Sequence, residues 1–173
     1  SFEDRRWADM SPAKRKIILL KLAESMRASR EELALLESLD VGKPIRDTMS
    51  VDVPSAAKTI QWYAETIDKV YGEVGPTGPD VLSLVTREPI GVVGAIVPWN
   101  YPLIVTAWKL GAALATGNSV VLKPASASPL TALRLAELAA EAGIPEGVLN
   151  VVPGPGAVLG EALARHPDVD KIA

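Results

Sequence analysis

The sequence predicts an α/β protein in which N-terminal helices pack on a parallel β-sheet that carries helices on both faces. Apolar residues recur at helical spacing through residues 11–71, whereas short apolar runs alternate with helical segments from residue 81 onward. Such alternation is typical of βαβ units and a parallel sheet. Residues 72–80 between the two regions are rich in glycine and proline. We therefore expect two parts. Residues 1–80 form an N-terminal helical segment, and residues 81–173 form the first part of a sheet domain that continues beyond this chain.

Two helices are predicted at the start of the chain. Ser11 and Pro12 are typical of an N-cap and a first helical position. The second helix begins after Ser29, which forms a capping-box pattern with Glu32, and it ends at Gly42. Their apolar faces comprise Leu19, Leu22, Met26, Leu33, Leu36 and Leu39.

A third helix is predicted from apolar residues that recur at helical spacing through residues 60–71, with Pro54 at its start or kinking it and Gly72 ending it. Its apolar positions are Ile60, Tyr63, Ala64, Ile67, Val70 and Tyr71.

The second half of the chain predicts the sheet domain. The expected strands are residues 81–88, 91–97, 119–122, 148–152 and 169–173. The expected helices are residues 101–115, 129–142 and 157–165, with Ser128 as the N-cap of the second.

Composition excludes several classes of protein. The net charge is −3 and the Lys and Arg residues are scattered, so the sequence shows no basic patch for binding nucleic acid. Charged residues interrupt every apolar run before it is long enough to span a membrane. The absence of cysteine rules out disulfides and a thiolate metal site, and fits a cytoplasmic location. The chain starts at Ser1 without a signal-like leader and stops at what looks like the start of a strand, so we expect both ends to be cuts through a longer protein.

Polar side chains follow two of the predicted strands. Asn100 comes after Val97-Pro98-Trp99, and Lys123 comes directly after the strand at residues 119–122. In an open α/β sheet, ligands bind beyond the carboxyl ends of the strands, so these groups suggest a site for an oxyanion and for a ribose or phosphate. Taken alone, Asn100 could instead cap the next helix, and Lys123 could be a solvated strand end.

Other polar or glycine-rich positions have ordinary structural explanations. Gly154 and Gly156, with Gly160 further on, form a G-x-G-x-x-x-G turn that differs from the dinucleotide fingerprint, so a tight βα turn explains it. Lys109 could extend its ammonium from an apolar helix into water. Asp40 could simply terminate its helix, and the single histidine, His166, suits a helix end.

The motifs Pro98-Trp99-Asn100, Trp108-Lys109-Leu110 and Lys123-Pro124-Ala125 together resemble the core of the aldehyde dehydrogenase superfamily, and the resemblance covers nearly the whole chain. It implies a Rossmann-like, incomplete dinucleotide-binding domain and NAD or NADP as cofactor. The implied cofactor-binding residues are Ile96, Val97, Pro98, Trp99, Asn100, Lys123, Ala125, Ser126, Gly156 and Gly160.

The resemblance also implies individual roles. Asn100 would stabilise the tetrahedral oxyanion of a thiohemiacetal, and Lys109 would relay a proton. Asp40 would help to hold a monovalent cation, together with a backbone carbonyl near Ala127. Many members carry glutamate where this chain has Ser126, and serine would not repel the 2′-phosphate of NADP.

Residues 11–16, 32–37 and 67–74 are most similar to the aminoaldehyde branch of the family, especially to the γ-glutamyl-γ-aminobutyraldehyde dehydrogenases of polyamine catabolism. This similarity implies a small aldehyde substrate, no nucleic acid or membrane partner, and a homo-oligomer, dimer or tetramer, for the full-length enzyme. The family reaction uses a cysteine thiolate and a glutamate base. This chain has no cysteine, so we expect it to be inactive alone. The alternatives are a stand-alone, non-catalytic nucleotide-binding or assembly module and a purely structural protein. The structural protein is disfavoured, because it gives Asn100 and Lys123 no shared purpose.

Overall fold

The computed structural model of the chain describes residues 2–173 and contains a four-stranded parallel sheet in the order β5-β4-β3-β6. The strands are β3 (Val92–Ile96), β4 (Ser119–Lys123), β5 (Leu149–Val151) and β6 (Lys171–Ile172). Successive strands add on one side of β3, and the chain then crosses to its other side to form β6. This reversal is the switch point at which open α/β sheets bind ligands.

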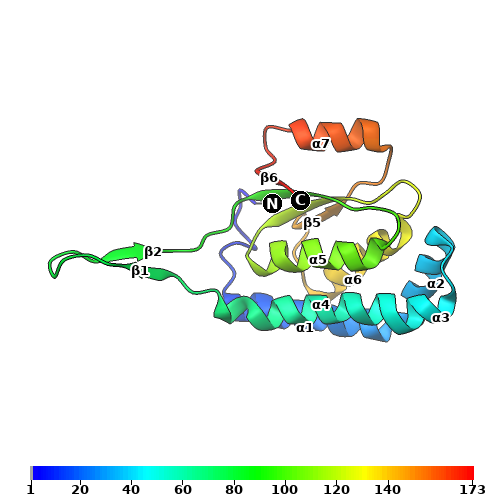
Figure 1. Cartoon of the computed structure of the whole chain (residues 1–173), viewed down its shortest axis with the longest axis horizontal. Coiled ribbons are helices and arrows are strands. Elements are labelled where there is room, and N and C mark those ends of the chain that lie inside the picture. The colour runs from blue at the N-terminus through cyan, green and yellow to red at the C-terminus, as the bar shows by residue number, and fades with distance from the viewer. Residues whose placement is uncertain (1) are drawn as a thin grey trace.

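Helices cover both faces of this sheet, in layers that Figure 1 shows edge-on. One face carries α5 (Pro102–Ala115) and α6 (Leu130–Ala142), and the other carries α7 (Glu161–Arg165), which follows a π-helical turn, η3 (Gly156–Gly160). Gly94 allows α7 to approach, because a Cβ there would lie 3.0 Å from the Leu163 Cγ and 2.7 Å from the Ile172 Cδ1.

The N-terminal helices form a further layer beneath α5 and α6. They are α1 (Pro12–Ala28), α2 (Arg30–Val41), the short α3 (Ile45–Asp47), the π-helical turn η1 (Thr48–Asp52), α4 (Val53–Thr66) and the 3₁₀ turn η2 (Ile67–Lys69). Ser11 caps α1 as predicted, with its Oγ accepting a bond from the Lys14 N–H. Leu19, Leu22 and Met26 are fully buried, and they share one continuous core with the sheet.

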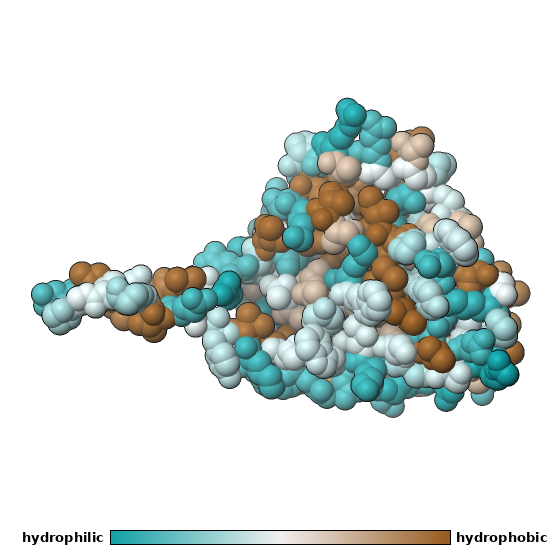
Figure 2. Space-filling view, in the orientation of Figure 1, coloured by the Kyte–Doolittle hydropathy of each residue, from teal (hydrophilic) through white to brown (hydrophobic). Residues whose placement is uncertain are grey.

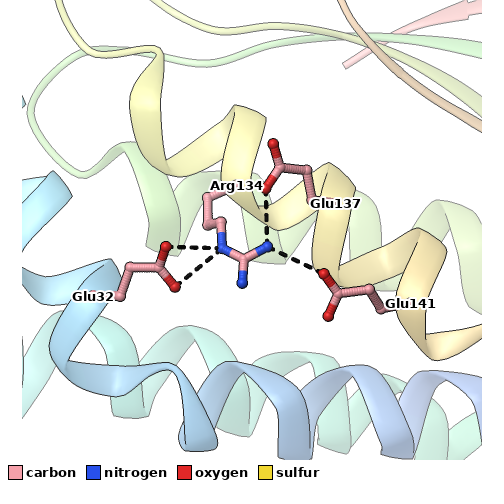
Figure 3. Close-up of polar contacts among 4 residues, drawn as sticks. All are labelled: Glu32, Arg134, Glu137 and Glu141. Atoms are coloured by element: carbon pink, nitrogen blue, oxygen red, sulfur yellow. Dashed lines mark hydrogen bonds and ion pairs between the residues drawn. The ribbon is translucent and has the colours of Figure 1, made fainter.

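The predicted capping box of α2 is wrong. Ser29 is the N-cap but makes no side-chain bond to the helix. Glu32 instead pairs with Arg134 of α6 at 3.0 Å, and the same guanidinium contacts Glu137 and Glu141 (Figure 3). A tertiary ion pair has replaced the local cap, and it joins α2 to α6. Leu39 is also not part of the core, since it is 68% exposed.

The largest departure concerns residues 70–88. The strand predicted at residues 81–88 is shortened to β2 (Ser83–Val85), and it pairs antiparallel with β1 (Glu73–Gly75) rather than joining the parallel sheet. The two strands form an arm that projects from the body (Figure 1). The helix predicted to reach residue 71 ends earlier, at η2. Gly72 lies at the base of the arm and close to the end of β2, since a Cβ at this position would be 2.5 Å from the Val85 carbonyl oxygen.

The boundary predicted at residue 80 falls within this hairpin, and the division into two domains stays a prediction. Pro54 lies at the start of α4, and Gly42 ends α2 in the left-handed conformation, both as expected. No helix within residues 2–173 combines the length and apolar content needed to cross a bilayer.

Candidate functional site

Three segments that are distant in sequence meet at the carboxyl edge of the sheet. Ile96 ends β3 and Lys123 ends β4, and the two residues are register partners. Gly160 of η3 lies over both, because a Cβ at that position would be 3.9 Å from the Lys123 Cδ and 4.0 Å from the Ile96 Cδ1. The structure therefore brings together members of the predicted cofactor-binding set from three elements.

Lys123 is not a solvated strand end. Only 4% of it is exposed, and its Nζ donates to the Pro124 carbonyl at 2.9 Å. Within residues 2–173 no carboxylate forms an ion pair with it. A buried ammonium without a counter-charge is suited to a ribose hydroxyl or a phosphate oxygen. Lys123 also lines a groove of about 190 Å³ with Leu163 and His166.

Ser126 joins the ends of two strands. Its Oγ donates to the Gly154 carbonyl at 2.8 Å, so the loop after β4 holds the turn after β5. Gly154 has a φ of 153°, which disfavours any residue with a side chain. Gly156 has no atom within 4 Å of the position that a Cβ would occupy, so its backbone is open to close approach. Ala125 lies half-buried between Lys123 and Ser126.

Asn100 is exposed in the bend between β3 and α5, as are Pro98 and Trp99, whereas Val97 is buried at the strand end. The N-cap of α5 is Tyr101, and no side chain of the cap bonds to the helix. The helix-cap alternative for Asn100 is therefore wrong. Its amide is free to donate to a ligand, because it makes no hydrogen bond to any of residues 2–173.

A buried carboxylate contacts the helix that follows Asn100. Glu37 of α2 is fully buried, and its Oε1 accepts a bond from the Leu103 N–H at 3.4 Å. Burial raises the pKa of Glu37 to about 7. Nearby, Lys43 pairs with the buried Asp52 at 2.6 Å and places its Nζ 3.6 Å from the centre of the Tyr101 ring.

Sequence reasoning did not identify this group. The position of Glu37, three and four residues after the buried Ala34 and Leu33, was the available indication that it faces inward.

Asp40 contacts a different helix. Its Oδ2 accepts a hydrogen bond from the Leu130 N–H at 2.7 Å, so this residue of α2 caps the N-terminus of α6. Burial raises the pKa of the Asp40 carboxyl. The predicted Ser128 cap is wrong, since the Ser128 hydroxyl is buried without a partner among the described residues. The described part of the chain contains no group of three or more acidic, histidine or cysteine side chains arranged to hold a metal ion.

Lys109 and His166 make no described contact with Asn100. Lys109 is half-buried in α5, nearly two turns from the start of the helix, which is about 10 Å along its axis. His166 ends α7, and its Nδ1 accepts from the Asp168 N–H at 3.2 Å, which is a structural role at a helix end.

The sheet is open and parallel, and the order in which its strands are added reverses at β3. Its carboxyl edge carries a buried lysine and an exposed glycine turn. These features place this chain in the class of Rossmann-like nucleotide-binding folds. The profile of the aldehyde dehydrogenase family matches residues 2–173. The chain belongs to the aldehyde dehydrogenase family, and the predicted family and fold class are confirmed.

The relatives of this chain include proteins whose names specify an aminoaldehyde. The chain is 62% identical over 172 residues to the NADP/NAD-dependent aldehyde dehydrogenase PuuC of Escherichia coli, with 99% of this chain and 35% of PuuC covered. The structure of γ-glutamyl-γ-aminobutyraldehyde dehydrogenase from Burkholderia cenocepacia is 59% identical, with a TM-score of 0.97 over 99% of this chain and 34% of that one. A mutant of P. syringae indole-3-acetaldehyde dehydrogenase in complex with NAD⁺ is 58% identical, with a TM-score of 0.97 and the same coverage. The chain thus spans about a third of the length of these relatives.

Proposed function

We propose that this chain forms part of an NAD(P)-dependent aldehyde dehydrogenase that oxidises an aminoaldehyde to its carboxylic acid. Its contribution would be one side of the cofactor site and the amide that stabilises the substrate oxyanion. Because the chain contains no cysteine, the thiolate nucleophile would come from outside residues 1–173. The complete enzyme, below, means this chain continued by the remainder of such a dehydrogenase, for which PuuC can supply the sequence.

The observation that carries this proposal is the convergence of Ile96, Lys123 and Gly160 at the carboxyl edge of the sheet. The Lys123 ammonium would donate to the ribose of the adenosine, and the open backbone at Gly156 would allow the adenine side of the cofactor to approach. Ile96, Val97, Pro98, Trp99, Ala125 and Ser126 would complete this wall. The nicotinamide, when bound, accepts the hydride that leaves the substrate.

Asn100 would act on the substrate rather than on the cofactor. When a nucleophile adds to an aldehyde, the carbonyl oxygen becomes negatively charged, and a donor already in place stabilises that charge without reorganising. The Asn100 side chain is exposed and unbonded within residues 2–173, so its N–H groups are available. Lys109 remains our candidate for proton relay, although it makes no described contact with Asn100.

The aminoaldehyde substrate, the cofactor range and the assembly are finer proposals. Relatives whose names specify aminobutyraldehyde and NADP/NAD support the first two. The exposed apolar arm supports a homo-oligomer. Asp40, with a carbonyl near Ala127, remains a candidate for a monovalent cation, and a cytoplasmic location remains a prediction from the sequence.

A substrate panel tests the function. The complete enzyme should oxidise γ-aminobutyraldehyde derivatives with a higher kcat/KM than acetaldehyde or benzaldehyde, measured by NADH formation. Equal values for all three would reject the aminoaldehyde assignment, and no oxidation of any aldehyde would favour a non-catalytic nucleotide-binding module.

A further inference from the structure

The loop that presents Asn100 is attached to the N-terminal helices at two points, and the first is Glu37. Pro102, the first residue of α5, has no N–H, and the N-cap Tyr101 supplies no capping side chain. The first N–H of the helix is therefore that of Leu103, which donates to Glu37 at 3.4 Å. Both groups are buried, so water cannot replace this acceptor.

The second attachment is at Tyr101, the residue directly after Asn100. The Lys43 ammonium lies 3.6 Å from the centre of the Tyr101 ring, a distance at which a cation is attracted to an aromatic face. Lys43 is itself fixed by Asp52 at 2.6 Å, and that carboxylate is buried. The cation therefore holds one position, and the ring packs beneath it.

Asn100 has no comparable attachment of its own. Its side chain is exposed and makes no hydrogen bond within residues 2–173. The position of its amide therefore depends on the backbone between β3 and the first turn of α5. A donor to a developing oxyanion is effective only when it is held in place before the reaction, and small displacements are costly.

We propose that Glu37 is a positioning residue for the dehydrogenase reaction, which fixes the Asn100 amide by anchoring the first turn of α5, with Lys43 holding the adjoining Tyr101 ring. This inference rests on the proposed role of Asn100 as the oxyanion donor. It assigns a catalytic purpose to the contact between the N-terminal helices and the sheet domain, and Glu37, which is fully buried, would act only through the groups that it positions.

The test compares Glu37→Leu with Glu37→Gln in the complete enzyme. Gln keeps an oxygen that can accept the Leu103 N–H, whereas Leu removes it at similar size. Acylation is measured as the pre-steady-state rate of NADH formation per folded molecule, alongside the Kd for NAD⁺ and the Tm. We expect Leu to slow acylation by roughly 10- to 100-fold with an unchanged Kd, and Gln to restore most of the rate. Normal acylation in folded Glu37→Leu, or a Gln variant as slow as Leu, would overturn the proposal.

If Glu37→Leu does not fold, the matched pair Lys43→Met and Lys43→Arg replaces it. Arg keeps the cation for Asp52 and for the Tyr101 ring, and Met removes it. Slower acylation in Met alone supports the proposal, and equal rates in the two variants refute it.

Repeating the variants in an Asn100→Ala background separates this inference from the function on which it rests. Asn100→Ala alone should slow acylation by roughly 10²–10³-fold. If Glu37 acts through Asn100, Glu37→Leu adds little further loss in that background. A full multiplicative loss would reject the positioning role and leave the oxyanion role intact. If Asn100→Ala acylates normally, the oxyanion role itself fails.

Discussion

Lys123 and Ser126 place a buried cation and an exposed uncharged side chain near each other at the end of β4. The Lys123 ammonium has no carboxylate partner among the described residues, and the Ser126 hydroxyl is used to hold the Gly154 carbonyl. A carboxylate at position 126 would repel a 2′-phosphate, whereas serine does not. If these two residues line the ribose site as proposed, we expect the complete enzyme to use both NAD and NADP.

We predict that Ser126→Glu shifts the cofactor preference of the complete enzyme toward NAD. The added carboxylate should lower kcat/KM for NADP by like-charge repulsion while changing the value for NAD much less. Ser126→Ala is the control, because it removes the bond to Gly154 without adding charge. If the NADP:NAD ratio is the same in Ser126→Glu and Ser126→Ala, position 126 does not face the ribose.

The raised pKa of Glu37 gives a pH-dependent prediction. A glutamate whose pKa rises from 4.5 to about 7 on folding binds more protons in the folded state across that interval. Stability is therefore lost as pH rises through it, by on the order of 3 kcal/mol in total. Glu37→Gln cannot ionise, so the Tm of the Gln variant minus that of the wild type should increase between pH 5 and pH 8. A difference that stays constant over this range would show that Glu37 does not titrate there.

Some site residues were predictable from the sequence and others were not. Asn100 and Lys123 follow recognisable strands in short motifs, so local order placed them at the strand ends, and the family resemblance made them candidates for the site. Glu37 and Asp40 act across the fold, because each accepts an N–H from a helix that lies 66 or 90 residues later in the chain. The local rules for caps failed for related reasons. At α6 the carboxylate of Asp40 replaced the predicted Ser128 cap, and at α2 the expected partner of Ser29, Glu32, paired with Arg134 instead.

At the scale of elements, the alternation of strands and helices after residue 91 was predicted to within a few residues, since each parallel strand is a short apolar run. The hairpin was not predicted. Its strands contain three residues each and lie in a region rich in glycine and proline, which resembles a connector. The pairing that defines them is a tertiary feature.

Alanine substitution at two glycines, Gly94 in β3 and Gly156 in η3, should have different effects, one on stability and the other on cofactor binding. Gly94→Ala places a methyl group against Leu163 and Ile172, so we expect a loss of about 1–3 kcal/mol of stability from overpacking. Gly156→Ala meets no atom within 4 Å, so the fold should be unaffected while NAD⁺ binding weakens. Thermal denaturation and cofactor titration of both variants check this. Unchanged NAD⁺ affinity in Gly156→Ala would remove Gly156 from the cofactor site.

At the scale of the whole molecule, a layered body carries one projecting arm. The body buries a continuous core from Trp7 to Val148, whereas the arm exposes most of its apolar side chains (Figure 2). Val74 and Leu84 lie opposite each other on the two strands and are both largely exposed. An isolated two-stranded hairpin is marginally stable in water, so this arm is suited to packing against another part of the assembled enzyme.

We predict that the arm joins subunits of the proposed homo-oligomer. Leu84→Lys should convert the complete enzyme from a dimer or tetramer into smaller species, because burying an unpaired ammonium at an apolar interface is unfavourable. Ile17→Lys is the matched control, since Ile17 is a similarly exposed apolar residue on α1, away from the arm. Sedimentation velocity at several protein concentrations measures the mass of both variants. If Leu84→Lys keeps the wild-type mass at every concentration, the arm packs within its own subunit instead. A shift in Ile17→Lys as well would mean that added surface charge alone weakens assembly.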